Sequence, residues 1–323
     1  MTISICMIVK NEEECLTRAL ASWRDLGDEL IIVDTGSTDN TVAIAEAHGA
    51  RVLTYDWQLP GHKGEARNVG LDAAIGDWIL VLDADEVIID PGQLRHILLN
   101  VPSEPAISGV NTLFRNMAED DSVLLEWYQM RVFRRGMYRY VHREHEIPTA
   151  TDHCHGIISS CKIVFEHRAP AGRDVGKISP MLERLRLDVE ERPNDSHSLY
   201  MYARQLAHNG QYDEAIKRGE QYMQMPRAGL KPDVARATAI CYMRMNNRPL
   251  MYEWMYRAAS YEPHRRLIWA ELALLYRADG NMQMALAMAR LALSLPLIPY
   301  QREMQPAERT ANIAQFIDEC QQA

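Results

Sequence analysis

Apolar runs and helical periodicities alternate along the first 90 residues of the chain. The apolar runs at 3–9, 29–33, 51–55 and 78–82 predict four strands. The segments between them, at 13–26, 41–48 and 63–74, carry apolar residues at helical spacing and predict helices. This β-α-β order is typical of a mainly parallel sheet covered by helices.

Polar residues gather directly after each predicted strand, at 10–12, 34–39, 56–57 and 83–86. Ligands of parallel α/β sheets bind beyond the carboxyl ends of the strands. We therefore expect these segments to frame a binding site. Shorter β-like runs at 107–114, 129–133, 138–141 and 157–165 predict mixed or antiparallel strands that complete this first domain.

From about residue 175 the chain becomes helical and repetitive. The Gly, Ala and Pro at 210, 215 and 226 recur 70 residues later, at 280, 285 and 296. A degenerate middle unit fits between them, with Asn246 at its turn and Pro263 at its end. The interval of 70 residues corresponds to two units of about 35 residues, a length that predicts a tetratricopeptide-like helical repeat domain. The alternative is an ordinary helical bundle. We place the α/β domain at 1–172, a linker helix at 173–195 and the repeats at 196–323.

Charge is unevenly spread over these two parts. The net charge of −9 divides into −11 for residues 1–170 and +2 for residues 171–323. An acidic first half disfavours binding of nucleic-acid polymers. Local carboxylates instead suit a divalent cation, which can hold a phosphate.

The expected location is cytoplasmic. The six cysteines show no dense disulfide framework, which favours a reducing compartment. The apolar run at 3–9 is too short for a membrane span and lacks the basic start of a signal peptide. No other stretch is apolar enough to predict a transmembrane segment.

Two aspartates follow the fourth predicted strand. Asp83 and Asp85 stand at i and i+2, where a loop lets both carboxylates converge on one hard cation. A D-x-D pair alone is common, but its position after a buried strand makes it more specific. In the segment after the second strand, Ser37 or Thr38 could cap the next helix. Asp34 has no capping role in this interpretation and is free to bind a base or ribose.

Four ordered motifs over about 80 residues resemble the family 2 glycosyltransferases of the GT-A fold. They are MIVKNEE at 7–13, VDTGSTD at 33–39, ARN at 66–68 and LDADE at 82–86. Three later motifs, RVFR at 131–134, HE at 145–146 and FEH at 165–167, resemble the bacterial subgroup with C-terminal tetratricopeptide repeats. This subgroup includes enzymes that glycosylate peptides.

The resemblance implies a role for each matching position. Asp34 would contact the nucleobase, framed by Val9, Asn11 and Glu12. Arg67 would lie near the donor pyrophosphate, beside Asp83 and Ala84. Asp83 and Asp85 would hold Mg²⁺ or Mn²⁺ on the two phosphates, and His167 would add another metal or phosphate contact, unless it is an ordinary boundary histidine. The loop at 58–64 departs from the family pattern through Pro60, Gly61 and Gly64, which leaves the donor sugar open.

The family inverts the anomeric centre, and this reaction needs a base for the acceptor proton. We choose Glu146 as this base, with Glu86 and Glu144 as alternatives. Glu146 could instead be an ordinary solvated carboxylate without a catalytic role. The donor would be a nucleotide sugar, with UDP-sugars the commonest case in the family. The acceptor could be a peptide, a glycan or another molecule. The repeats could bind it or form a homodimer.

Three other interpretations compete. A catalytically degenerate scaffold could recruit a protein partner through the repeats, although intact Asp34, Arg67, Asp83 and Asp85 favour an enzyme. A nucleotidyltransferase would need a Gly-rich loop after the first strand, which residues 10–13 lack. A structural zinc could use the His and Cys residues between 142 and 167, but the adjacent residues 153–155 point to opposite sides of an extended chain and no C-x-x-C pair occurs.

Overall fold

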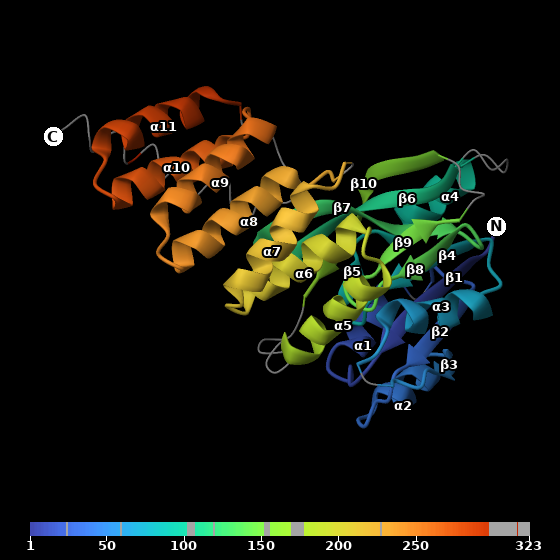
Figure 1. Cartoon of the computed structure of the whole chain (residues 1–323). Coiled ribbons are helices and arrows are strands. Elements are labelled where there is room, and N and C mark those ends of the chain that lie inside the picture. Colours follow the sequence, from blue (N-terminus) through green and yellow to red (C-terminus); the bar gives the residue numbers. More distant parts are fainter. Residues whose placement is uncertain are drawn as a thin grey trace. The chain divides into compact units, whose positions relative to one another are not determined.

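The computed structural model of the chain describes residues 1–296 except 24, 59, 102–106, 119, 152–155, 169–177 and 227, together with residue 315. Residues 173–177 of the predicted linker helix and most of 297–323 therefore lie outside the described residues. The chain divides into two compact units, Met1–Arg184 and Leu185–Ala323 (Figure 1). In the part that the structure describes, no helix combines the length and apolar character needed to cross a bilayer.

An eight-stranded sheet forms the centre of the first unit. Its strands are β1 (Ile3–Val9), β2 (Glu29–Asp34), β3 (Arg51–Thr54), β4 (Trp78–Leu82), β5 (Glu86–Ile88), β6 (Ile107–Met117), β7 (Val123–Arg134) and β10 (Gly156–His167). They lie in the order β3-β2-β1-β4-β7-β6-β10-β5. The first four run parallel, β7 is antiparallel to β4 and β6, and β10 is parallel to β6 and antiparallel to β5. The predicted mixed, mainly parallel sheet is confirmed.

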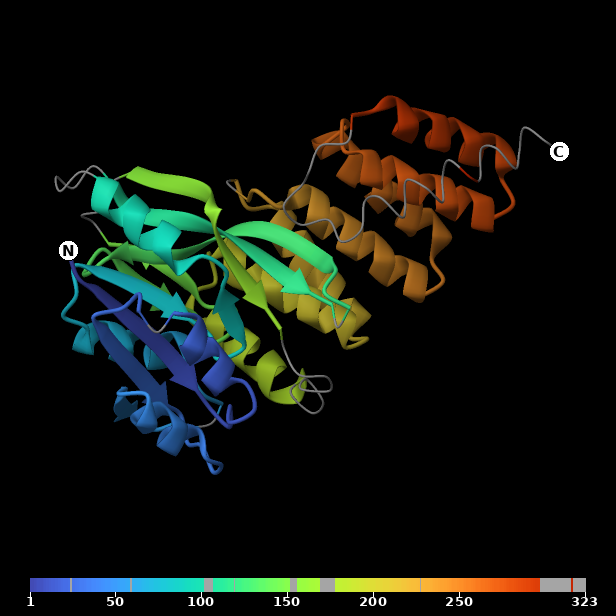
Figure 2. The ribbon, with the colours of Figure 1, turned by 180° about the vertical axis from the view of Figure 1, so that it is seen from behind.

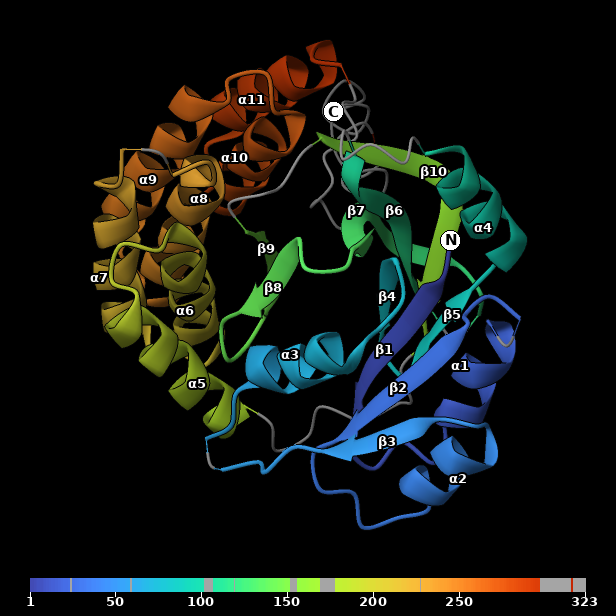
Figure 3. The same ribbon diagram turned by 90° about the vertical axis from the view of Figure 1, so that its right-hand side faces the viewer.

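Helices and a small hairpin cover both faces of this sheet. One face carries α1 (Leu16–Ser22), α2 (Thr41–Ala47) and α4 (Pro91–Asn100), and the other carries α3 (Lys63–Ala73) and the hairpin of β8 (Tyr138–Val141) and β9 (Ile147–Ala150) (Figures 2 and 3). Successive side chains of a strand point to opposite faces, so Ile5 and Met7 pack beneath the first group and Cys6 beneath the second. Burial on both faces explains why these strands are continuously apolar in sequence.

Three elements were not predicted: β5, β9 and α4. For α4 a signal was present, because Asp90 accepts a hydrogen bond from Gln93 N (3.2 Å) and Pro91 occupies the first turn. An Asp followed by Pro is a helix start. The strand β5 has only three residues, too few for a periodicity to register, and β9 contains Pro148, which argues against a strand in the sequence.

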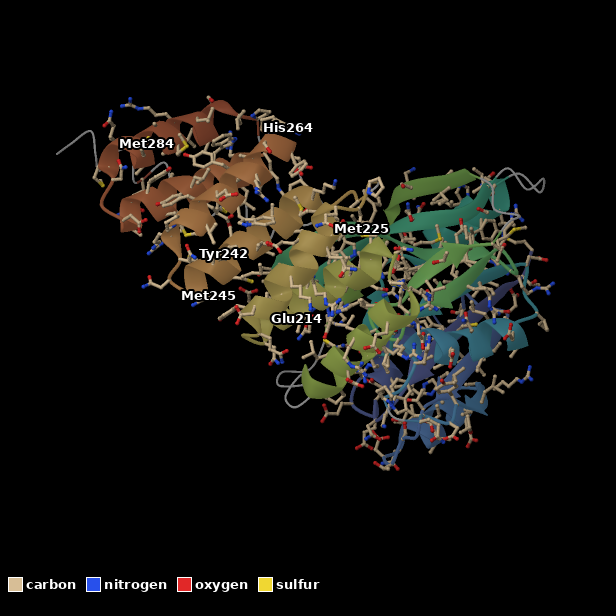
Figure 4. All side chains as sticks on the ribbon, viewed as in Figure 1. Glu214, Met225, Tyr242, Met245, His264 and Met284 are labelled. Atoms are coloured by element: carbon tan, nitrogen blue, oxygen red, sulfur yellow. The ribbon has the colours of Figure 1, made fainter. Side chains whose placement is uncertain are left out.

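The second unit is built from helix pairs. After α5 (Ile178–Glu191), which crosses the boundary between the units, come α6 (Ser196–His208), α7 (Tyr212–Met223), α8 (Lys231–Arg244), α9 (Arg248–Tyr261), α10 (Arg266–Ala278) and α11 (Met282–Ser294). Figure 4 labels Glu214 on α7, Tyr242 on α8 and Met284 on α11, so this succession can be followed.

The three helix pairs share their turn geometry. Gly210, Asn246 and Gly280 all adopt left-handed backbone, with φ of 76°, 58° and 75°. Glycine and asparagine tolerate this conformation best, and it reverses the chain after each first helix. Ala215 and Ala285 are buried at the helix contacts. The predicted repeat, including its degenerate middle unit, is confirmed.

Candidate functional site

Hydrogen bonds join the loops after β1 and β2 at the carboxyl end of the sheet. Asn11 adopts left-handed backbone (φ 54°), and its side-chain Oδ1 accepts a hydrogen bond from Thr38 N (2.7 Å). Asn11 N donates to Ser37 Oγ (3.0 Å), and Glu12 N donates to Thr41 Oγ1 (2.7 Å). The carbonyl of Val9 accepts from the Thr35 hydroxyl (3.0 Å). These bonds order the segment that the resemblance assigns to the nucleobase.

Asp34 lies at the end of β2 and is almost fully buried. Its carboxylate accepts hydrogen bonds from the backbone N–H of Gly36 (3.1 Å) and of Ser37 (3.1 Å). Asp34 makes no cap bond to α2, as expected, but the turn that follows the strand engages its carboxylate, because a short side chain at a strand end reaches that turn. Its role toward a base stays a prediction.

The first turn of α2 is held by a side-chain hydrogen bond to Asp39, one residue before the N-cap Asn40, which makes no side-chain cap bond itself. Asp39 Oδ1 accepts from both the N–H (3.0 Å) and the hydroxyl of Thr41 (2.5 Å). Ser37 and Thr38 bond to Asn11 instead. The prediction that Ser37 or Thr38 caps this helix is wrong, because the neighbouring loop competes for both residues.

Two arginines hold Asp83 where β4 ends. Arg67 of α3 donates from Nη2 to Asp83 Oδ1 (2.6 Å), and Arg131 of β7 donates from Nη2 to Oδ2 (3.4 Å). Burial raises the pKa of Asp83, but the guanidinium groups of Arg67 and Arg131 hold it far below its ordinary value. Arg131 stands at a register shift between β6 and β7, an irregularity that can re-aim a side chain. Asp83 is therefore a permanent carboxylate.

Glu86 lies beneath Asp83 and is fully buried. Its carboxylate pairs with Arg131 and accepts from Asp83 N (3.1 Å). Burial raises the pKa of Glu86 to about 8, opposed by Arg131 and assisted by the negative charge of Asp83. Through these two contacts Glu86 holds the backbone at Asp83 and the side chain of Arg131 in place.

Asp85 faces His167, the last residue of β10. Asp85 Oδ2 lies 3.2 Å from His167 Nε2, and His167 Nδ1 lies 3.2 Å from Asn116 Oδ1 on β6. The backbone of Asp85 is fixed as well, because its carbonyl accepts from Arg168 N (3.0 Å). The hydrogen bond to Asp85 raises the pKa of His167, with burial opposing it. The predicted neighbours Asp85 and His167 are thus brought together.

This pair suits a metal ion in its donor chemistry. A metal-ligating histidine commonly gives its second ring N–H to a carbonyl oxygen, and Asn116 accepts in that manner here. Within the described ranges, no group of three or more His, Cys, Asp or Glu side chains forms a metal-binding cluster. The combined ligand set of Asp83, Asp85 and His167 stays a prediction, with Asp83 engaged by arginines. His153, Cys154 and His155 of the zinc alternative lie outside the described residues.

Glu146 joins this site through Arg67. Arg67 Nε donates to Glu146 Oε1 (2.8 Å), so one guanidinium bridges Glu146 and Asp83. The guanidinium also lies over the Tyr140 ring, 5.3 Å from its centroid. Of the alternative bases, Glu86 pairs with Arg131 and Glu144 with Lys63 and Arg184. Glu146 therefore lies nearer to Asp83 in the contact network than Glu144 does.

Two buried nitrogen atoms of these arginines have no partner among the described residues. They are Arg67 Nη1 and Arg131 Nε. Leaving a buried charged donor unpaired is costly, so each of these nitrogen atoms calls for a partner such as a bound anion or an ordered water. Both belong to side chains that already contact Asp83.

Sequence reasoning assigned no role to Arg131 or Asn116. Arg131 had a signal, since a lone arginine within an apolar β-run indicates a buried partner. Asn116 had none, because only the pairing of β6 with β10 brings it opposite His167.

Comparison with known proteins places these features in a family. The model of glycosyl transferase family 2 matches residues 4–164, and a tetratricopeptide repeat model matches residues 189–217. A TPR repeat-containing protein of Synechococcus elongatus is 30% identical over 328 residues, which cover 90% of this chain and 75% of that protein.

Other relatives match a smaller share of the chain. An uncharacterised glycosyltransferase of Rickettsia felis is 44% identical over 84 residues, 26% of this chain and 29% of that protein. The glucosyl-3-phosphoglycerate synthase of Mycobacterium tuberculosis is 38% identical over 102 residues, 29% of this chain and 31% of the synthase. Its crystal structure with Mn²⁺, UDP-glucose and phosphoglyceric acid aligns with 35% of this chain and 44% of its own, with 33% identity and a TM-score of 0.30.

Proposed function

Because the chain belongs to the family 2 glycosyltransferases and carries tetratricopeptide repeats after its transferase unit, we propose that it moves a sugar from a nucleotide-sugar donor with the help of a divalent cation. The observation that carries this proposal is the cluster of Arg67, Arg131, Asp83, Asp85 and His167 at the carboxyl end of β4. Parallel sheets bind their ligands at this end.

The donor diphosphate is the anion that fits this cluster. Arg67 Nη1 and Arg131 Nε are buried donors that phosphate oxygens would satisfy. Asp85 and His167, with Asp83, would hold Mg²⁺ or Mn²⁺, which neutralises the charge that builds on the departing diphosphate. Asp34, with Val9, Asn11 and Glu12 on the adjoining loop, would hold the nucleoside, and Ala84 would lie at the diphosphate beside Asp83. The match to the M. tuberculosis synthase, which binds Mn²⁺ and UDP-glucose, supports a UDP-sugar.

We assign the general base to Glu146. In an inverting displacement the base lies across the sugar from the leaving group and takes the acceptor proton. Arg67 holds the Glu146 carboxylate on one side and Asp83 on the other, which supports a position beside the donor. The acceptor would be a peptide or a glycan, and the repeats would either bind it or join two copies of the chain.

A panel of nucleotide sugars with Mn²⁺, read out as release of nucleoside diphosphate, tests the proposal. Asp85→Ala should abolish release because it removes a cation ligand, whereas Asp72→Ala, an exposed aspartate paired with Arg139, should not. Glu146→Ala should keep donor binding and stop transfer. Release by Asp85→Ala at the parent rate would contradict the metal assignment.

A further inference from the structure

The loop between β8 and β9 carries Glu146 in an unusual conformation. Residues 142–146 form this loop, and His142 and His145 both adopt left-handed backbone, with φ of 77° and 52°. Residues other than glycine rarely take this conformation, and it persists only where the surroundings enforce it. The contacts of the 142–146 loop therefore decide where Glu146 lies.

The first turn of α3 docks onto the 142–146 loop. Lys63 N donates to the carbonyl of Arg143 (3.2 Å), and Gly64 N donates to the carbonyl of His142 (3.2 Å). A Cβ at Gly64 would lie 2.7 Å from the His142 oxygen, so only glycine allows this approach. One turn later α3 presents Arg67, which binds Glu146. The helix and the loop thus form one positioned unit.

Glu144 is the charged anchor of this unit. Its side chain is 3% exposed and pairs with Lys63 of α3 and with Arg184 of α5. Arg184 Nε lies 2.7 Å from Glu144 Oε2, and Arg184 Nη1 donates to the carbonyl of Pro60 (3.0 Å). One buried guanidinium therefore ties the 142–146 loop to the segment that leads into α3.

We propose that Arg184 is a positioning residue for the transfer reaction: through Glu144 it fixes the 142–146 loop, and through the loop it sets Glu146 against Arg67. This inference rests on the proposed function. We expect Arg184 to act on the geometry of the base and not on donor binding, because the bond of Arg67 to Asp83 does not involve the 142–146 loop.

Replacing Arg184 by methionine in the full chain keeps most of the side-chain volume and leaves Lys63 on Glu144, so the fold persists. Arg184→Met should lower kcat for diphosphate release by about tenfold to a hundredfold, since small misplacements of a catalytic group cost this much. The donor KM should stay within about twofold. The matched control is Arg186→Met, an exposed arginine on α5 paired with Glu190, which should change neither constant.

A second variant separates positioning from general damage. If Arg184 works through Glu146, adding Arg184→Met to Glu146→Gln should lower kcat no further. A double variant whose loss in kcat equals the product of the two single losses would overturn the proposal. An Arg184→Met variant with a changed donor KM and an unchanged kcat would also overturn it.

Hydrogen exchange gives a readout that is independent of turnover. Amides of the 142–146 loop should exchange faster in Arg184→Met than in the parent or in Arg186→Met. Unchanged exchange would refute the positioning role. A parent chain that releases no diphosphate from any nucleotide sugar would refute the proposed function alone, and exchange would then decide the loop contact by itself.

Discussion

Neighbouring carboxylates of the site have different chemistry because each has a different partner. Asp83 bonds two guanidinium groups, Asp85 an imidazole and Glu146 one guanidinium. Asp83 and Asp85 are two residues apart in sequence, yet only Asp85 adjoins a second candidate metal ligand. We therefore expect Asp83 to position the two arginines and Asp85 to be the main carboxylate ligand of the cation.

The sequence alone predicted where these carboxylates lie but not their partners. Their position followed from the end of an apolar strand. The partners of Asp83 are 16 and 48 residues away, on α3 and β7, and only the folded sheet brings them together. The bonds of Asp34 to Gly36 and Ser37 are local, but they were missed because the polar residues of this segment were interpreted as caps of the next helix.

Glu144 makes stability depend on pH. Burial raises its pKa, but Lys63 and Arg184 outweigh burial and hold the pKa below its ordinary 4.5. A folded-state pKa below the unfolded value stabilises the fold above the unfolded pKa, and this stabilisation is lost as pH falls through the folded pKa. In urea titrations, Glu144→Gln should lower the free energy of unfolding at neutral pH, and its difference from the parent should shrink below about pH 4.

The control for this titration is Glu190→Gln, which removes an exposed carboxylate from α5. It should leave the pH dependence close to that of the parent, because exposed ion pairs contribute little. A gap between parent and Glu144→Gln that widened toward acid pH would show that the charge on Glu144 does not stabilise the fold.

At the scale of elements, α3 connects the binding end of the sheet with the β8–β9 hairpin. The strands of the sheet were predictable because burial on both faces gives continuous apolar runs. The helices were predictable because their apolar residues recur at the helical period. The docking of α3 on the hairpin was not predictable. It depends on backbone carbonyls of His142 and Arg143, which leave no trace in side-chain pattern.

Gly64 tests this docking. Alanine normally strengthens a helix, but at Gly64 its Cβ would meet backbone oxygen at 2.7 Å. We expect Gly64→Ala to lower the free energy of unfolding by about 1–3 kcal/mol through overpacking. Gly92→Ala in α4, where the nearest atom lies at 3.4 Å, should instead raise it by about 0.5–1 kcal/mol. Chemical denaturation measures both, and a stabilised Gly64→Ala would refute the close approach.

At the scale of the whole molecule, each of the two units has its own hydrophobic core, so we expect the units to unfold separately. The first unit packs around its sheet, and the second packs helices around small residues such as Ala239, Ala258 and Ala273. The repeats were readable from sequence because a landmark at a fixed interval survives divergence elsewhere. The sequence did not predict how the repeats contribute to acceptor choice, since the pattern of their helices is not specific to one class of ligand.

Calorimetry should resolve two unfolding transitions in the full chain, since each unit has its own core. Mn²⁺ with UDP at a hundred times its Kd should stabilise only the first unit, by about 2.7 kcal/mol. Ala273→Leu, which overpacks a fully buried position of α10, should lower only the other transition. One transition that moves as a whole in both experiments would contradict independent units.

Anomalous diffraction from a crystal soaked with Mn²⁺ and UDP tests whether Asp85 and His167 hold the cation. We expect a manganese peak bonded to Asp85 and His167, with diphosphate oxygens on the metal and on Arg67. A bound UDP with no manganese at Asp85, and with Asp85 still hydrogen-bonded to His167, would contradict it.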